Sequence, residues 1–234
     1  MSVIERVGVV VPARDEAALL PRCLGALDAA TEWLRVKRPH VRVSVMVVLD
    51  SCVDASAVAV GRHPDVLIAP TSAGNVGAAR QTGVRRLVVA AAPDWFATTD
   101  ADSAVPVDWL VHQVDAAASG LHLLLGTVVP DDTEITAPQF ARWQARHSDG
   151  DGHGYVYGAN LGFSRRALDA TGGFRPLPAH EDVDFAERVK AVGLRWAASA
   201  ALPVLTSART IGRTPDGFAG YLRDDLDGRP VRGA

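Results

Sequence analysis

The chain has 234 residues and a formal net charge of −3 at pH 7. Hydrophobic residues make up 48% and charged residues 22%, which is ordinary globular composition with enough apolar surface for a sizeable core. The sequence has no long basic run, which excludes the usual nucleic-acid binders. No apolar run reaches the ~18 residues that a membrane span needs, and no signal peptide precedes the first strand-like segment. Two cysteines are too few for a disulfide framework or a zinc site, so we expect reduced thiols in a cytoplasmic protein.

Apolar and amphipathic segments alternate along the chain. Strand character is found at residues 7–11, 41–49, 66–69, 95–97, 121–129, 155–163 and 195–205. Helical character is found at 16–37, in a short segment after residues 51–56 that ends near 62, and in a segment that begins within 74–83 and ends near 92. It is found again at 107–119, 137–146, 165–170, 180–192 and 215–226. This alternation predicts a single α/β domain with a mostly parallel, twisted sheet flanked by helices.

Polar residues follow the strands of the first half. Pro12, Asp50 and Asp100 each stand where an apolar run stops. The carboxyl ends of parallel strands share one edge of the sheet, and ligands of open α/β sheets bind outside that edge. The chemistry is therefore expected in the loops after these strands.

Asp100 and Asp102 flank a single alanine just past the apolar run 95–97. Two carboxylates in one turn can converge on one cation, and Mg²⁺ and Mn²⁺ take oxygen ligands together with substrate phosphates. The spacing is also common in solvated turns. In that alternative, Ser103 caps a helix that starts near Pro106.

Residues 74–83 combine three glycines with Asn75 and Arg80 at an expected helix start. Free backbone N–H groups at such a start favour an anion, and Arg80 lies one turn further on. The segment does not follow a Walker-A or dinucleotide spacing. A glycine-rich turn with a surface arginine is an equal alternative.

Three carboxylates open the expected helix at residue 180: Glu181, Asp182 and Asp184. Acidic residues at a helix start complement the helix dipole, which is one explanation. Asp182, however, shares a helical face with Phe185 and Val189. A carboxylate at the mouth of an apolar stripe would hold its proton more tightly, which suits a general base.

Arg209 and Arg213 lie in a loop of small residues at 206–213. Guanidinium groups offer forked donors that could clamp a diphosphate. Residues 148–154 are rich in glycine, which suits either a lid over the site or, more usually, an ordinary connection.

Six ordered motifs resemble those of the family 2 glycosyltransferases of GT-A fold. The motifs are VVVPARDE at 9–16, LDSCVD at 49–54, NVGAAR at 75–80, TDAD at 99–102, GAN at 158–160 and HED at 180–182. The resemblance covers residues 3–215. It implies an inverting, metal-dependent enzyme that moves a sugar from a nucleotide-diphosphate donor to an acceptor hydroxyl. It divides the domain into a nucleotide-binding half, about 1–103, and an acceptor and catalytic half, about 104–226.

The residues and the resemblance together give the expected site. The nucleotide-sugar is expected on Pro12, Arg14, Glu16, Asp50, Asn75, Arg80, Asp100, Arg209 and Arg213. Mn²⁺ or Mg²⁺ is expected on Asp100 and Asp102, with Asp102 the more direct ligand. The catalytic residues are Asp182, as base, and Glu181. The acceptor side is expected at Gly158, Asn160 and His180, although residues 130–160 carry no pattern specific to one acceptor.

The sequence departs from the family pattern in three ways. Leu49-Asp50 replaces two aspartates, Cys52 replaces a small polar residue, and no membrane tail or processive extension supports a polysaccharide synthase. One alternative is a sugar-phosphate nucleotidyltransferase, whose glycine-rich loop and lysine are not found at residues 8–20. Another is a nucleotide-sugar-binding module without activity, although such a module would not need a base.

Overall fold

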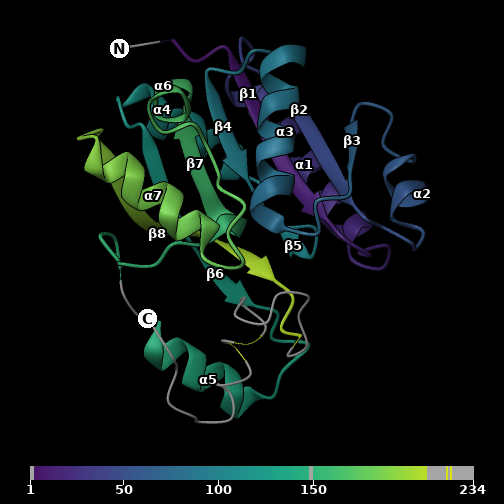
Figure 1. Cartoon of the computed structure of the whole chain (residues 1–234). Coiled ribbons are helices and arrows are strands. Elements are labelled where there is room, and N and C mark those ends of the chain that lie inside the picture. The colour runs from purple at the N-terminus through teal and green to yellow at the C-terminus, as the bar shows by residue number, and fades with distance from the viewer. Residues whose placement is uncertain (1–2, 148–149, 210–219, 221, 223–234) are drawn as a thin grey trace.

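The fold is built on one eight-stranded sheet with helices on both faces (Figure 1). The computed structural model describes residues 3–147, 150–209, 220 and 222. The strands are β1 (Arg6–Ala13), β2 (Arg42–Asp50), β3 (Leu67–Thr71), β4 (Trp95–Thr98), β5 (Ser103–Ala104), β6 (Leu123–Pro130), β7 (Leu161–Ser164) and β8 (Trp196–Thr206). The helices are α1 (Leu20–Lys37), α2 (Ser56–Val60), α3 (Val76–Ala90), α4 (Trp109–Ala118), α5 (Ala137–Arg146), α6 (Arg165–Thr171) and α7 (Glu181–Ala191).

The strand order is β3-β2-β1-β4-β7-β6-β8-β5. β1 pairs in parallel with β2 and β4, β2 with β3, and β6 with β8, whereas β7 runs antiparallel to both β4 and β6. Two reversals across β7 restore the direction, so β6 and β8 run the same way as β4. The carboxyl ends of β1, β2, β4, β6 and β8 therefore meet at one edge of the sheet. The expected α/β class with a mostly parallel sheet is confirmed.

Two hydrophobic cores lie on the two faces of the sheet. In β1, Val9 and Val11 point into the core under α1, while Val10 points into the core under α3. Both faces are covered, so the strand is apolar at successive positions and does not alternate with polar residues. In the second core Phe163 stacks on Phe96 with ring centroids 5.3 Å apart and meets Phe185 edge-on at 4.8 Å.

Several boundaries differ from the sequence expectation. Pro12 does not end its strand, because β1 continues to Ala13 beside β2 after its pairing with β4 has stopped. α1 begins at Leu20 and not at residue 16, since the preceding turn places Asp15 at a φ of 52°. Of the expected strand 155–163, only the end is extended, because Gly158–Asn160 forms a 3₁₀ turn that leads into β7. The short strand β5 was not expected.

The outlying segments carry two further expectations. In the glycine-rich segment, Gly152 donates a hydrogen bond to the Ala198 carbonyl of β8 at 2.9 Å, so this part is tied to the sheet; residues 148 and 149 lie outside the described residues. The helix expected at 215–226 also lies outside them, except for residues 220 and 222. Among the described residues, no helix combines the length and the apolar character that crossing a membrane requires.

The packing of α3 on the sheet predicts opposite effects for two mid-helix glycines. A Cβ on Gly83 of α3 would lie 2.5 Å from Cγ1 of Val10 and 2.9 Å from Cγ2 of Val48, whereas a Cβ on Gly25 of α1 meets nothing within 4 Å. We expect Gly83→Ala to lower the free energy of unfolding by about 1–3 kcal/mol through overpacking. Gly25→Ala should raise it by roughly 0.5–1 kcal/mol, because alanine is the better helix former. Urea unfolding measures both, and a stabilised Gly83→Ala would contradict the close packing of α3.

Candidate active site

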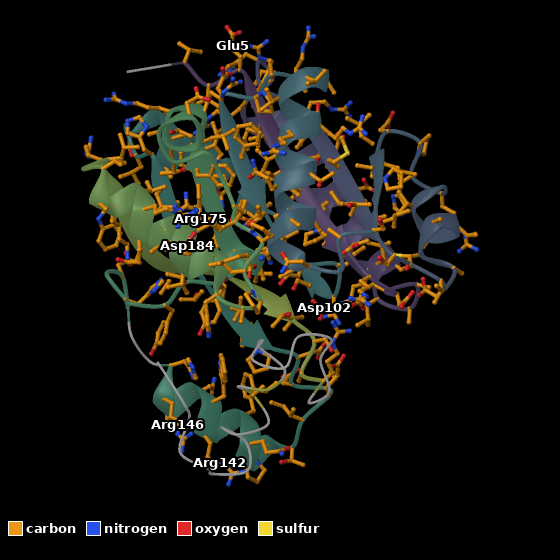
Figure 2. The ribbon with its side chains drawn as sticks, viewed as in Figure 1. Glu5, Asp102, Arg142, Arg146, Arg175 and Asp184 are labelled. Carbon is orange, nitrogen blue, oxygen red and sulfur yellow. The ribbon has the colours of Figure 1, made fainter. Side chains whose placement is uncertain are left out.

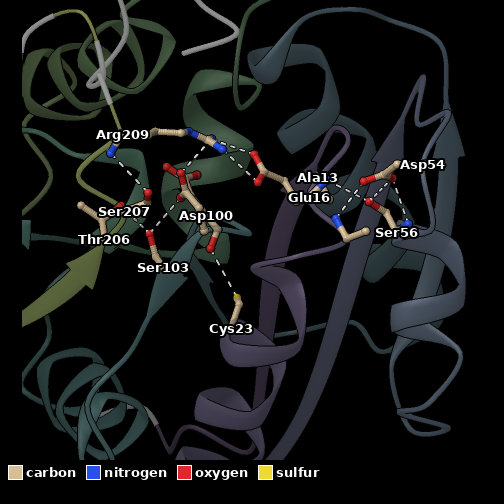
Figure 3. A network of polar contacts seen from close by, with 12 residues as sticks. Ala13, Glu16, Cys23, Asp54, Ser56, Asp100, Ser103, Thr206, Ser207 and Arg209 are labelled. Atoms are coloured by element: carbon tan, nitrogen blue, oxygen red, sulfur yellow. Dashed lines mark hydrogen bonds and ion pairs between the residues drawn. The ribbon is translucent and has the colours of Figure 1, made fainter. Parts of the chain in front are cut away.

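Loops from five elements meet at the carboxyl edge of the sheet. Figure 3 shows Glu16 after β1, Asp100 after β4 and Arg209 after β8 reaching toward one another. Figure 2 places Asp102 near the lower edge of the sheet in that view. The sequence expectation that the loops after the strands gather the polar residues is thus met by the topology.

The Asp100 and Asp102 turn is short and closed. β4 ends at Thr98 and β5 begins at Ser103, whose backbone N–H donates to the Asp100 carbonyl at 3.1 Å. Ser103 does not cap a helix: its hydroxyl donates to Thr206 Oγ1 at 2.9 Å, and α4 begins only at Trp109. The helix cap of the solvated-turn alternative is therefore wrong, and the turn is only partly solvated: the Asp102 side chain is 13% exposed and the Asp100 side chain 35%.

The surroundings of Asp102 disfavour its ionised form, because the side chain is buried next to other carboxylates. Burial and the neighbouring charges of Asp100 and Glu16 raise the pKa of Asp102 to about 6, although Arg209 and a backbone hydrogen bond oppose the rise. Beneath the turn, the Cys23 thiol donates to the Asp100 carbonyl at 3.3 Å, and burial with both aspartates raises the pKa of that thiol. Cys23 is therefore a protonated support for the turn.

Arg209 binds the carboxylates of two different loops. Its Nη1 and Nη2 donate to the two oxygens of Glu16 at 3.0 and 2.7 Å, and its Nη2 lies 2.8 Å from Asp102 Oδ2. Burial opposes the charge, but Glu16 and Asp102 raise the pKa of Arg209 overall. Arg213, its expected partner in a diphosphate clamp, lies outside the described residues.

Glu134 was missed by the sequence analysis. Its Oε2 accepts hydrogen bonds from the Ser207 hydroxyl at 2.8 Å and from the Ala208 backbone N–H at 2.7 Å. It therefore fixes the segment that carries Arg209. An acidic residue in the irregular loop after β6 has no local pattern that marks this role, because its partners are more than 70 residues away.

Arg80 of α3 is the most deeply buried charged group of the site. Only 3% of the residue is exposed, so the surface-arginine alternative is wrong. Its Nη1 pairs with Glu181 and its Nη2 with Asp100 at 2.6 Å. Burial alone would lower its pKa, but Asp100, Glu181 and Asp182 raise the pKa of Arg80 on balance. One guanidinium thus joins the turn after β4 to the start of α7.

The start of α3 already holds an anion of the protein itself. Asp50 accepts hydrogen bonds from the backbone N–H groups of Gly74 and Asn75 at 2.9 and 3.0 Å. Asn75 caps the helix by accepting from the Ala78 N–H at 2.9 Å and donates to the Leu177 carbonyl at 2.6 Å. Asp50 and Asn75 therefore hold the loop in place, and their expected contacts with a nucleotide remain predictions.

The three carboxylates at the start of α7 have different partners. Glu181 is buried against Arg80, and burial raises the pKa of Glu181. Asp182 is half-buried and accepts hydrogen bonds from the backbone N–H groups of Gly158 at 2.7 Å and Val183 at 2.9 Å. Asp184 pairs with Arg188 of the next turn at 2.7 Å. Glu181 and Asp184 each pair with an arginine, whereas Asp182 accepts its hydrogen bonds from backbone N–H groups, so helix-dipole compensation does not describe all three alike.

Gly158 is clamped between three groups. Its N–H donates to Asp182, its carbonyl accepts from the Thr98 hydroxyl at 2.6 Å, and a Cβ there would lie 2.4 Å from Cζ of Arg80. Only glycine leaves room for the guanidinium. The turn before β7 therefore packs directly against Arg80, next to the Asp100 turn.

The other expected site residues surround this centre. The Asn160 amide is buried, donates to the carbonyls of Thr127 and Leu202 and accepts from Trp109 Nε1. It joins β6, β8 and α4, and its acceptor-side role stays a prediction. His180 is exposed in a left-handed conformation at the start of α7, with a φ of 59°. Pro12 is the penultimate residue of β1, and the exposed Arg14 lies near Gly74.

The Asp100 and Asp102 pair has the donor chemistry that a divalent cation requires. Both ligands are hard carboxylate oxygens, each gives one oxygen to an arginine, and the raised pKa of Asp102 marks a carboxylate that a cation would stabilise. A second cluster, Asp15, Cys52 and Asp54, has ligand atoms within 4.8 Å of one another. Asp15 accepts a hydrogen bond from the Val53 backbone N–H, and Asp54 accepts one from the Ala17 N–H. These bonds join the loops after β1 and β2, which explains the cluster without a metal.

Comparison with solved structures confirms the expected GT-A fold. S. aureus TarS (residues 1–349, in complex with UDP-GlcNAc) matches with a TM-score of 0.70 and 13% identity, over 91% of this chain and 61% of that one. The Pyrobaculum calidifontis mannosyltransferase PcManGT, in complex with GDP-Man and Mn²⁺, matches with a TM-score of 0.63 and 21% identity, over 88% and 58%. A mycobacterial protein matches with a TM-score of 0.61 and 16% identity, over 97% and 76%. The chain thus spans about three fifths of the length of the first two.

No curated protein matches the chain by sequence. The model of the family described as glycosyl transferase family 2 matches residues 8–172, which is more than half of the chain and includes five of the six ordered motifs. Together with the arrangement of those motifs at one sheet edge, this match confirms the resemblance seen in the sequence: the chain belongs to glycosyl transferase family 2.

Proposed function

We propose that the protein is a metal-dependent, inverting glycosyltransferase that moves a sugar from a nucleotide-diphosphate donor to an acceptor hydroxyl. The observation that carries the proposal is the position of Arg80. It binds Asp100, in the turn expected to hold the metal and diphosphate, and Glu181, next to the expected base. In this proposal, donor chemistry and acceptor activation lie on two sides of one buried guanidinium.

On the donor side, Asp102 and Asp100 would hold Mn²⁺ or Mg²⁺. When bound, the cation stabilises the negative charge of the departing diphosphate. Arg209 lies at the same turn and supplies further positive charge. Asp50 and Asn75, with the turn of Pro12, Arg14 and Glu16, would contact the nucleotide. The complexes of TarS with UDP-GlcNAc and of PcManGT with GDP-Man and Mn²⁺ support this class of donor.

On the acceptor side, Asp182 would take the proton of the attacking hydroxyl. The Gly158 N–H fixes one of its oxygens, so the carboxylate has a defined direction. A single base acting on the attacking group, opposite the departing diphosphate, gives inversion at the anomeric carbon. Gly158, Asn160 and His180 are the residues proposed to lie on the acceptor side. Glu181 was expected to be catalytic; its burial against Arg80 favours a positioning role.

A donor panel tests the proposal directly. We expect UDP-GlcNAc or GDP-mannose to raise the melting temperature in the presence of Mn²⁺, and the bound donor to be hydrolysed slowly when water replaces the acceptor. Binding without any hydrolysis or transfer would favour a binding module. Release of pyrophosphate from a nucleoside triphosphate and a sugar phosphate would favour a nucleotidyltransferase.

The metal assignment predicts that Asp102→Ala abolishes the Mn²⁺ dependence of nucleotide-diphosphate binding, because removal of one of two protein ligands leaves mostly water around the ion. Titration calorimetry with and without Mn²⁺ measures this. Cys52→Ser is the matched control, since Cys52 belongs to the other cluster of metal-ligand residue types. Loss of metal dependence in the control and not in Asp102→Ala would move the metal to the Asp15, Cys52 and Asp54 cluster.

The base assignment predicts distinct effects for the three carboxylates of α7. Asp182→Asn keeps the hydrogen bond from Gly158 but cannot take a proton, so turnover should fall by roughly 10² to 10⁴ with donor affinity little changed. Asp184→Asn loses its ion pair with Arg188, which should cost up to about 1 kcal/mol of stability and leave turnover near the wild-type value. Steady-state transfer, or donor hydrolysis, and thermal unfolding separate the two. Equal and mild losses at both positions would leave the base unassigned.

A further inference from the structure

Arg209 is the cation that sits on Asp102 in this structure. Its Nη2 lies 2.8 Å from Asp102 Oδ2, the carboxylate that the proposed function gives to the metal. The other nearby guanidinium, Arg80, is engaged by Asp100 and Glu181. Among the described residues, Arg209 is therefore the only ion-pair partner of Asp102.

The bonds of Arg209 are unequal. Two run to Glu16, one to each carboxylate oxygen, while a single contact runs to Asp102. Bidentate pairs are the stronger and more directional kind. The guanidinium can therefore leave Asp102 and keep one or both bonds to Glu16.

The backbone around Arg209 is fixed independently of its side chain. The Ser207 N–H donates to the Asp102 carbonyl at 3.1 Å, and Glu134 holds the Ser207 hydroxyl and the Ala208 N–H. Movement of the Arg209 side chain thus requires no unfolding of this segment. The guanidinium of Arg209 already contacts the Asp100 and Asp102 turn, where the donor diphosphate is expected.

A guanidinium and a divalent cation compete for the same carboxylate. Two positive groups a few ångströms apart repel each other strongly in a partly buried site. A diphosphate reverses the balance, because its oxygens attract both cations, and arginine binds phosphate oxygens in the same forked geometry as carboxylate oxygens.

Building on the proposed function, we propose that Arg209 is a displaceable counter-cation: it neutralises Asp102 while the donor site is empty and passes to the donor diphosphate when a divalent cation takes Asp102. In this arrangement Glu16 is the tether that keeps Arg209 at the site in both states. The diphosphate and not the nucleoside or the sugar is the group it recognises.

The proposal gives one substitution two effects of opposite sign. Arg209→Gln should strengthen the binding of Mn²⁺ alone by about tenfold, since a competing charged contact is removed, and weaken the binding of UDP or GDP at saturating Mn²⁺ by about tenfold. The free Mn²⁺ signal in electron paramagnetic resonance measures the first, and titration calorimetry the second. Arg209→Lys keeps the charge and should bind Mn²⁺ within about threefold of wild type.

Arg22→Gln is the matched control. Arg22 pairs with Asp131 at the same edge of the sheet, so its removal takes away one positive charge without touching Asp102. It should change neither affinity by more than about twofold. A thermal unfolding curve for each variant confirms that it is folded.

The outcomes separate this proposal from the proposed function. If Mn²⁺ binds wild type and Asp102→Asn abolishes that binding, but Arg209→Gln leaves Mn²⁺ affinity unchanged or lower, the counter-cation role is overturned and the metal site stands. If Arg22→Gln strengthens Mn²⁺ binding as much as Arg209→Gln, the effect is one of net charge and the proposal is also overturned. If neither wild type nor Arg209→Gln binds Mn²⁺, the metal site of the proposed function fails, and this proposal with it.

Discussion

The buried guanidinium of Arg80 is the constraint on which the rest of the site depends. A charge that is 3% exposed is tolerable only if carboxylates surround it, and Asp100 and Glu181 are those carboxylates. The two come from loops about 80 residues apart in sequence. Because Arg80 must satisfy both at once, the turn after β4 and the start of α7 are held at a fixed separation. Replacement of either acid would leave a buried charge partly unpaired.

The same constraint explains why glycine stands where the chain crosses Arg80. Gly158 packs on the guanidinium with no space for a Cβ. A Cβ on Gly77, at the start of α3, would lie 2.2 Å from the Arg175 carbonyl oxygen and 3.0 Å from Cβ of Glu181. These contacts bring backbone N–H groups within reach of side chains. One of them, Gly158 N–H, orients Asp182. The side chain proposed as base is thus directed by packing around an arginine that it does not itself bind.

Charge at the sheet edge is arranged around two arginines. Arg80 pairs with Asp100 and Glu181, and Arg209 pairs with Glu16 and Asp102. Burial keeps the pKa of Asp102 raised in spite of Arg209, so additional positive charge beside it would stabilise its ionised form. A divalent cation at this turn, as in the proposed function, would supply that positive charge.

The sequence by itself determined the order of the elements, the α/β class, the family and most of the residues that gather at the edge. Those features are local: apolar runs set the strands, helical spacing sets the helices, and short motifs carry the resemblance. The tertiary structure alone decided which side chains of the site pair with one another. The pairing of Arg80 with Glu181, of Arg209 with Glu16 and of Glu134 with Ser207 joins residues 101, 193 and 73 positions apart. No local pattern encodes such pairs, because they depend on the antiparallel insertion of β7 and on strand register, which fix the loops that face one another.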